Sequence, residues 1–314
     1  MKVIRSLYTY EPPRDIVLTI GSFDGIHRGH QHLLHNLVQR AQETRRLSAV
    51  LTFHPHPEAV VYPERQPQYL SSPQERTSII ENLGIDILFL TLFDRELAKT
   101  SARELLIILH HRLRMRELWI GRDFAMGQDR EGDIPTLRDL ATEIGYRLHV
   151  VSPLYDAGEP ISSTRIRTLL SKGRVGDAGA LLGRLYTIPG RVVKGAQRGR
   201  SLGFRTANLQ IDPQRAMPKR GVYAAWAILH GERQKCVVNV GTRPTFDDQH
   251  LQIEAHLLDY KGDLYEKELE IAFVQRLRAE KQFPSADALI DQVHRDISAA
   301  RKILDQRLEK ALSP

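Results

Sequence analysis

Two histidines, His27 and His30, stand three residues apart in the stretch GSFDGIHRGH, directly after an apolar segment. Gly21, Gly25 and Gly29 lie in the same stretch, where they let the backbone turn sharply and approach a ligand closely. The N-terminus of a helix attracts phosphate, and two imidazole donors stabilise a phosphate that gains charge during a reaction. The stretch therefore predicts a phosphate-transfer site, although an isolated histidine pair is more typical of a protein surface or a metal site.

Hydroxyl and guanidinium groups gather in a second stretch, ISSTRIRTLL at residues 161–170. Ser162, Ser163 and Thr164 precede Arg165 and Arg167 at the start of a predicted short helix. Capping hydroxyls, free N–H groups and guanidinium forks together suit the β and γ phosphates of a nucleotide. Ordinary helix capping is the alternative interpretation of this stretch.

Thr206 and Asn208 are two residues apart in the C-terminal half and therefore share one face of a predicted strand. A hydroxyl and an amide oxygen placed in this way can bind Mg²⁺ together with the phosphates of ATP. The histidines of TFHPHP, at residues 52–57, suggest zinc instead, but no further cysteine or histidine stands at metal-ligand spacing. The sequence favours Mg²⁺, and a plain turn is the alternative for Thr206 and Asn208.

The elements that position these residues differ between the two halves of the chain. From residue 16 to about residue 170, apolar segments alternate with helical patterns, which is typical of a doubly wound α/β fold with a parallel sheet. Ligands bind beyond the carboxyl ends of such strands, where His27 and His30 stand. Residues 55–73 hold five prolines and predict a long surface loop that covers the site. Strands are expected at residues 16–20, 48–53, 85–93, 118–121 and 147–151.

After about residue 184 short alternating strands replace this rhythm and predict a six-stranded antiparallel β-barrel with a closing helix at residues 286–312. We therefore expect two domains, residues 1–184 and 185–314, with residues 169–183 as the connector. The barrel strands are expected at residues 186–193, 207–211, 222–229, 235–240, 252–258 and 268–274.

Composition limits the class of protein. The 314 residues carry a formal net charge of +7, which suits anionic ligands. The single cysteine, Cys236, excludes an intramolecular disulfide and is expected to be buried. No segment approaches the length of a signal peptide or a membrane span, and no nucleic-acid-binding motif is present. We expect a cytoplasmic protein that binds neither nucleic acid nor membrane, as a monomer or weak homo-oligomer.

The N-terminal motifs resemble those of a known superfamily. GSFDGIHRGHQ resembles the HxGH motif of the nucleotidyltransferases, in the form found in bacterial FAD synthetases, and residues 161–170 and GRDFAMGQDREGD at residues 121–133 are similar to further motifs. The resemblance implies attack on the α-phosphate of ATP with release of pyrophosphate, and catalytic roles for His27 and His30. It implies ATP-binding roles for Gly21, Phe23, Gly29, Ser162, Ser163, Thr164 and Arg167, and flavin-binding roles for Asp123 and Phe124.

The C-terminal half looks like riboflavin kinase, in GVYAAW at residues 221–226, VVNVGTRPTF at 237–246 and IEAHLLDYKGDLYEK at 253–267. The resemblance implies that Glu254 is the general base, that Thr206 and Asn208 bind Mg²⁺ and ATP, and that Gly195, Arg278 and Glu280 bind the flavin. An exposed strand residue is the alternative for Glu254, and a surface ion pair the alternative for Arg278 and Glu280.

Two residues depart from the kinase pattern. Arg205 replaces the proline of the PTAN motif, and Glu266 replaces the glycine of the YGK motif.

Over residues 15 to 305 the chain resembles the bacterial bifunctional riboflavin kinase/FMN adenylyltransferase family, whose substrates and products are ATP, riboflavin, FMN and FAD. The alternatives are an FMN adenylyltransferase with an impaired kinase domain and an RNA-binding module built on the nucleotidyltransferase fold.

Overall fold

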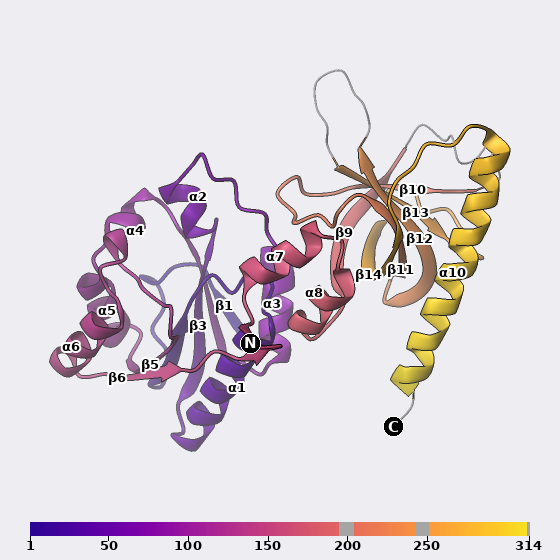
Figure 1. Ribbon diagram of the computed structural model, residues 1–314. Coiled ribbons are helices and arrows are strands. Elements are labelled where there is room, and N and C mark those ends of the chain that lie inside the picture. Colours follow the sequence, from indigo (N-terminus) through magenta and orange to yellow (C-terminus); the bar gives the residue numbers. More distant parts are fainter. Residues whose placement is uncertain (195–203, 243–250, 313–314) are drawn as a thin grey trace. The chain divides into compact units, whose positions relative to one another are not determined.

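The computed structural model describes residues 1–194, 204–242 and 251–312 (Figure 1). The chain divides into two compact units, Met1–Ser163 and Thr164–Pro314. This division precedes the predicted boundary after residue 184. The second unit includes α7 (Ser163–Ser171), apart from Ser163 itself, and α8 (Val175–Leu182). Gly195, expected to bind the flavin, lies outside the described residues.

The first unit is built on a six-stranded parallel sheet in the order β1-β4-β3-β2-β5-β6 (Figure 1). The five predicted strands are present, and the sequence interpretation missed only β1, a short and partly polar strand that pairs with the distant β4. The strands are β1 (Lys2–Ile4), β2 (Ile16–Ile20), β3 (Leu47–His54), β4 (Ile87–Leu92), β5 (Met115–Gly121) and β6 (Arg147–Val151).

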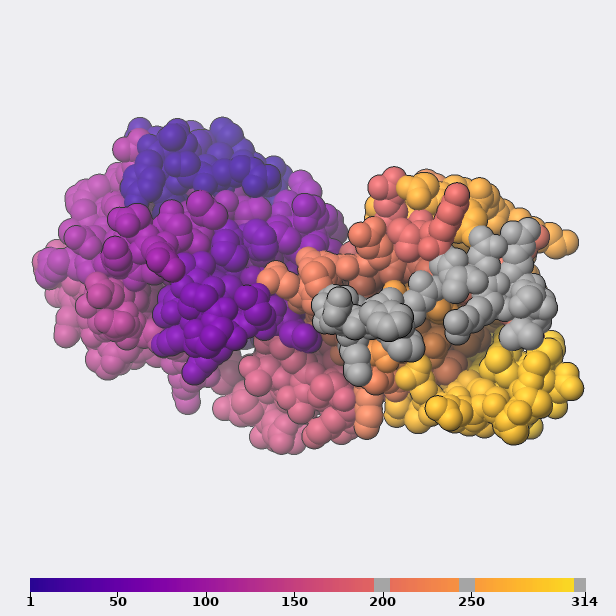
Figure 2. Space-filling model, turned by 90° about the horizontal axis from the view of Figure 1, so that it is seen from above, coloured from indigo at the N-terminus to yellow at the C-terminus, as the bar shows by residue number. Residues whose placement is uncertain are grey.

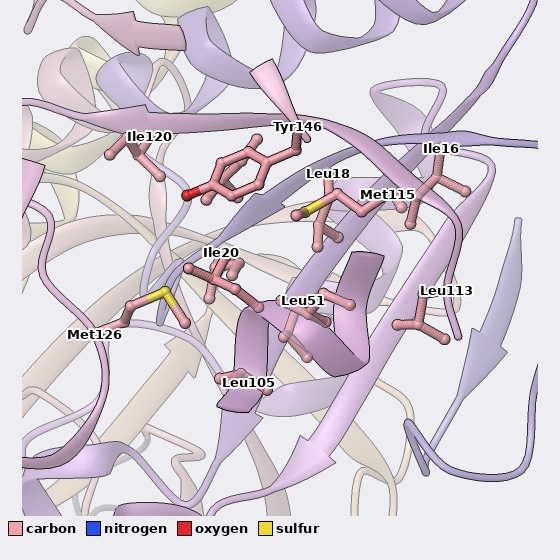
Figure 3. Close-up of a cluster of buried hydrophobic side chains, with 14 of the residues drawn as sticks. Ile16, Leu18, Ile20, Leu51, Leu105, Leu113, Met115, Ile120, Met126 and Tyr146 are labelled. Atoms are coloured by element: carbon pink, nitrogen blue, oxygen red, sulfur yellow. The ribbon is translucent and has the colours of Figure 1, made fainter. Parts of the chain in front are cut away.

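Helices cover both faces of this sheet because neighbouring strand residues point to opposite sides. On one face Val17 and Val50 pack with α1 (Arg28–Glu43) and α3 (Pro73–Asn82). On the other face α5 (Ala102–His111) and α6 (Ile134–Ile144) complete the apolar cluster drawn in Figure 3, in which Leu18, Leu51, Leu105 and Met115 meet. The two cores hold the carboxyl ends of the strands in fixed positions.

The segment predicted as a surface loop, residues 55–73, is more ordered than expected. It contains a short helix, α2 (Pro57–Val61), and it then buries Tyr69, Leu70 and Ser71. The prolines do mark its start, but polar contacts with a distant loop bury its end, and no local pattern predicts such contacts. The remaining short elements of the unit are α4 (Arg95–Lys99), η1 (Gln128–Arg130), β7 (Tyr155–Asp156) and β8 (Glu159–Pro160).

The second unit is the predicted closed antiparallel barrel, in the order β10-β13-β12-β11-β14-β9. Cys236 lies buried in it as expected, and α10 (Ala286–Leu312) packs Ala300 and Leu304 against its outer face. The yellow atoms of α10 form an outer surface of this unit in Figure 2. The strands are β9 (Tyr186–Val193), β10 (Ala207–Gln210), β11 (Gly221–Leu229), β12 (Glu232–Thr242), β13 (Leu251–Leu257) and β14 (Glu268–Arg278).

The predicted connector, residues 169–183, is largely helical. Val175, Ala178, Leu181 and Leu182 of α8 are buried, and α8 packs on β14 and β9. Within the described ranges, no helix has the length and apolar character that crossing a membrane requires.

Candidate active sites

The loop between β2 and α1 has an unusual backbone. Phe23 and Ile26 are both buried, and they adopt left-handed φ values of 47° and 38°, which cost free energy for residues other than glycine. Gly25 between them has a φ of 77°. This sequence of turns ends β2 and begins α1 at Arg28, with His27 as its N-cap.

His27 and His30 meet at this helix start. His27 Nδ1 accepts a hydrogen bond from the backbone N–H of His30 at 3.3 Å, so the proton of a neutral His27 ring is on Nε2. The two rings are stacked, with their centroids 3.7 Å apart. Burial and the neighbouring His27 hold the pKa of His30 well below its ordinary value. The His30 ring is therefore neutral at neutral pH and offers an N–H donor beside the N-terminus of α1.

A cavity of about 1000 Å³ opens at the carboxyl ends of the strands. Its lining contains most of the residues that the sequence predicted for the first site, namely Gly21, Phe23, His27, Gly29, His30, Asp123 and Phe124. It also contains cationic side chains that the sequence analysis did not select, namely Arg95, Lys99, Arg122 and Arg130. They lie in α4 and in the segment after β5, and no recognisable motif surrounds Arg95 and Lys99. The cavity thus combines imidazole donors, positive charge and an apolar wall.

The loop after β5 carries Asp123 and Phe124 into this cavity. Met126 and Gly132 exchange two backbone hydrogen bonds, which closes the loop. A Cβ atom at Gly127 or Gly132 would lie 2.5 to 2.6 Å from atoms of Ala102 at the start of α5, so these positions require glycine. The glycines of the 121–133 motif therefore seat the loop on α5.

The second predicted phosphate-binding stretch is divided between the two units. Ser163 donates its hydroxyl hydrogen bond to the carbonyl of Asp24 at 2.9 Å, which ties the stretch to the β2–α1 loop. Ser162 is half-buried in the same unit, whereas Thr164 and Arg167 belong to the second unit. The proposed contact of these four residues with ATP stays a prediction.

The candidate kinase site lies on the barrel. Thr206, which directly precedes β10, lines a cavity of about 320 Å³ together with residues 260–265. Asn208 is 8% exposed and lies directly opposite Glu254 in the pairing of β10 with β13, and Asn239 of β12 lies opposite Glu254 on its other side. Directly opposite residues of antiparallel strands share a face, so a carboxylate stands between two amides.

The residues expected near the riboflavin have defined surroundings. The guanidinium of Arg278 donates three hydrogen bonds of 2.8 to 3.1 Å to the carboxylate of Asp296 on α10, so its ion pair is with Asp296 and not with Glu280. The carboxylate of Glu280 lies over Gly241, where a Cβ atom would overlap Oε1. Asp296 was missed from sequence because it is distant along the chain.

Both departures from the kinase pattern are accommodated. The backbone carbonyl of Arg205 accepts a hydrogen bond from Nδ1 of His256 at 2.8 Å. Glu266 has a left-handed φ of 64° and forms an ion pair of 2.6 Å with Arg191 on β9. Glycine adopts such a φ without strain, which explains the residue that the resemblance leads one to expect at this position.

Comparisons with known proteins agree with this division. Residues 10–165 match the family model of FAD synthetase, and residues 182–304 match that of riboflavin kinase. The chain is 35% identical to the bifunctional riboflavin kinase/FMN adenylyltransferase of Escherichia coli (strain K12), over 96% of this chain and 97% of that protein. It is 34% identical to the protein of the same name from Bacillus subtilis (strain 168), over 89% and 90%.

A solved structure is also similar. The crystal structure of a protein named as a macrolide-efflux protein from Streptococcus pneumoniae matches with a TM-score of 0.88 and 29% identity, over 95% of this chain and 98% of that chain. Because near full-length relatives exceed 30% identity and two family models cover the two halves, the chain belongs to the bifunctional riboflavin kinase/FMN adenylyltransferase family.

Proposed function

We propose that the two activities of this family reside in separate sites of this chain. In the first unit FMN reacts with ATP to give FAD and pyrophosphate, and in the barrel riboflavin reacts with ATP to give FMN and ADP. The observation that carries the first assignment is the stacked His27 and His30 pair at the N-terminus of α1, in a large cavity with cationic walls.

Adenylyl transfer in this cavity needs no covalent enzyme intermediate. An oxygen of the FMN phosphate attacks the α-phosphorus of ATP, a new P–O bond forms, and the bond to the β-phosphate oxygen breaks to release pyrophosphate. His27 Nε2–H and the His30 ring donate hydrogen bonds to the α-phosphate oxygens as negative charge develops there. Since the low pKa of His30 keeps it neutral, it acts as a hydrogen-bond donor. The N-terminal amides of α1 favour the same charge.

Phosphoryl transfer in the barrel uses Glu254 as its base. The 5′-hydroxyl of riboflavin attacks the γ-phosphorus of ATP, its proton passes to the Glu254 carboxylate, and ADP leaves. Thr206 and Asn208 would hold Mg²⁺, because hydroxyl and amide oxygens suit this cation and Asn208 lies directly beside the Glu254 carboxylate. When bound, Mg²⁺ supplies neutralisation of phosphate charge.

The test separates the two reactions by chromatography of products. His30→Ala is expected to lower FAD formation from FMN by about 100-fold to 1000-fold, as for loss of one transition-state donor, and to leave FMN formation from riboflavin unchanged. Glu254→Ala is expected to do the reverse. In each variant the retained activity shows that the protein is folded. Parallel loss of both activities in folded protein contradicts separate sites.

An adenylyltransferase with an impaired kinase is the second candidate, because Arg205 and Glu266 depart from the kinase pattern. Incubation of the unmodified protein with riboflavin, ATP and Mg²⁺ decides between the two. FMN among the products excludes the impaired kinase.

A further inference from the structure

A buried arginine outside the sequence motifs links the loop after β2 to the carboxyl end of the neighbouring strand β3, beneath the first site. Arg76, on α3, is 1% exposed. Its Nη1 donates to the carbonyl of Ser22 at 2.7 Å and to the carbonyl of Phe53 at 3.2 Å. Ser22 belongs to the β2–α1 loop and Phe53 to the end of β3, so one nitrogen fixes the distance between these backbones.

The same loop is held from a second side. The carboxylate of Asp24, 1% exposed, accepts hydrogen bonds from the backbone N–H groups of Leu70 and Ser71 at 2.9 to 3.0 Å. The hydroxyl of Ser71 accepts from the N–H of Gly25 at 2.8 Å. Residues 70–76 thus contact the β2–α1 loop at three positions, Ser22, Asp24 and Gly25.

These contacts act on a strained segment. The left-handed φ values of Phe23 and Ile26 are unfavourable for residues other than glycine, and such conformations persist only where the surroundings determine them. The contacts to Ser22, Asp24 and Gly25 are among the interactions that oppose relaxation of this loop. His27 follows Ile26 directly, so relaxation displaces the ring that caps α1 and stacks on His30.

Fold stability alone is a poor reason for an arginine at this position. Its Nε and Nη2 are buried and have no hydrogen-bond partner among the described residues, so two of its three nitrogens lack the hydrogen bonds that usually offset the burial of a charge. Arg76 is also not among the described residues that line the cavity, so it acts through the backbone.

We propose that Arg76 is a positioning residue for adenylyl transfer: by linking the carbonyls of Ser22 and Phe53 it holds the β2–α1 loop in the strained form that aims His27 and His30. Asp24 and Ser71 serve the same loop. This inference rests on the catalytic role proposed for the two histidines.

The main test is Arg76→Met, which keeps a long side chain but removes the donors. Misplacement of reacting groups by about 1 Å costs about 100-fold in rate, so we expect the kcat of FAD formation to fall by about that factor. The KM values for ATP and FMN are expected to change less than about twofold, because the cavity walls stay in place. FMN formation by the barrel is the internal reference. Arg76→Lys keeps one donor nitrogen, and its kcat for FAD formation is expected to exceed that of Arg76→Met by at least about tenfold.

The matched control is Glu117→Gln. Glu117 is a fully buried carboxylate on β5 that accepts from Arg40 at 2.9 Å and Arg46 at 2.6 Å, near the amino ends of the strands. This variant also disturbs a buried charge of the first unit, and it is expected to lower the melting temperature while leaving the kcat of FAD formation unchanged. Arg76→Met with a lowered melting temperature but an unchanged kcat overturns the proposal.

Two further variants complete the test. If Arg76→Met does not fold, Ser71→Ala removes only the contact to Gly25 and one to Asp24, and an unchanged kcat for this variant then refutes the positioning role. His30→Ala distinguishes the two levels of inference. Full activity of His30→Ala overturns the proposed site, whereas an inactive His30→Ala beside a fully active Arg76→Met overturns the positioning role alone.

Discussion

Gly29 offers a small change that separates the stability of α1 from the position of His27. A Cβ atom at residue 29 would lie 3.1 Å from Cε1 and Nδ1 of His27 and 3.5 Å from the carbonyl oxygen of Ile161. The optimal separation of non-bonded carbon atoms is about 3.5–4.0 Å, so in Gly29→Ala the imidazole has to move by a few tenths of an ångström. The atom under pressure, Nδ1, is the one that accepts from the N–H of His30.

In Gly29→Ala, stability and reaction rate are expected to respond differently, because helix propensity acts on the first and the position of the His27 ring on the second. Alanine is favoured over glycine by about 0.8–1.0 kcal/mol in a helix interior, and at Gly29, the second residue of α1, part of this gain offsets the cost of moving the ring. We therefore expect the free energy of unfolding to stay within about 1 kcal/mol, or a melting temperature within about 4 °C. Complete loss of a transition-state donor costs about 100-fold to 1000-fold, and a displaced donor costs less, so the kcat of FAD formation should fall by about 10-fold to 100-fold.

The assay measures FAD formation from FMN and FMN formation from riboflavin on the same preparation, with a thermal melt. Gly176→Ala is the control, because Gly176 is also helical and its Cβ would make only an ordinary contact of 3.5 Å with the carbonyl of Val274. It should leave the rate of FAD formation unchanged. A Gly29→Ala protein with normal stability and the full rate of FAD formation would show that the position of the His27 ring does not control the reaction.

Three further predictions concern other parts of the chain. In Gly241→Ala the new Cβ overlaps Oε1 of Glu280, so the carboxylate has to move. The KM for riboflavin should rise several-fold in steady-state kinetics, while FAD formation from FMN stays unchanged. Since the pKa of His30 is depressed in the folded state, the unfolded chain takes up this proton first as the pH falls below 6.5. Urea unfolding should therefore show that the free energy of unfolding of the first unit falls by about 1 kcal/mol between pH 7.5 and 5.5. The fall should be smaller in His30→Gln. Glu266→Gly removes the left-handed strain and an exposed ion pair with Arg191 that contributes about 0–1 kcal/mol. The melting temperature should therefore stay equal or rise, and the kinase should remain active. A clear loss of stability would contradict this prediction.

The sequence by itself determined the two folds and the main chemistry. Strand and helix periodicities are local, so five of the six parallel strands, the barrel and α10 were predicted near their observed positions. The glycines and histidines of residues 21–30 are also local, since one turn and one helix start bring His27 and His30 together.

Tertiary structure decided the contacts between segments that are distant in the chain. β1 exists because it pairs with β4, and Asp296 reaches Arg278 only once α10 packs on the barrel. Arg76 and Ser71 lie 46 to 54 residues from the loop they hold. Periodicity carries no information about such pairs, because a hydrogen bond between segments depends on where the packed sheet places them.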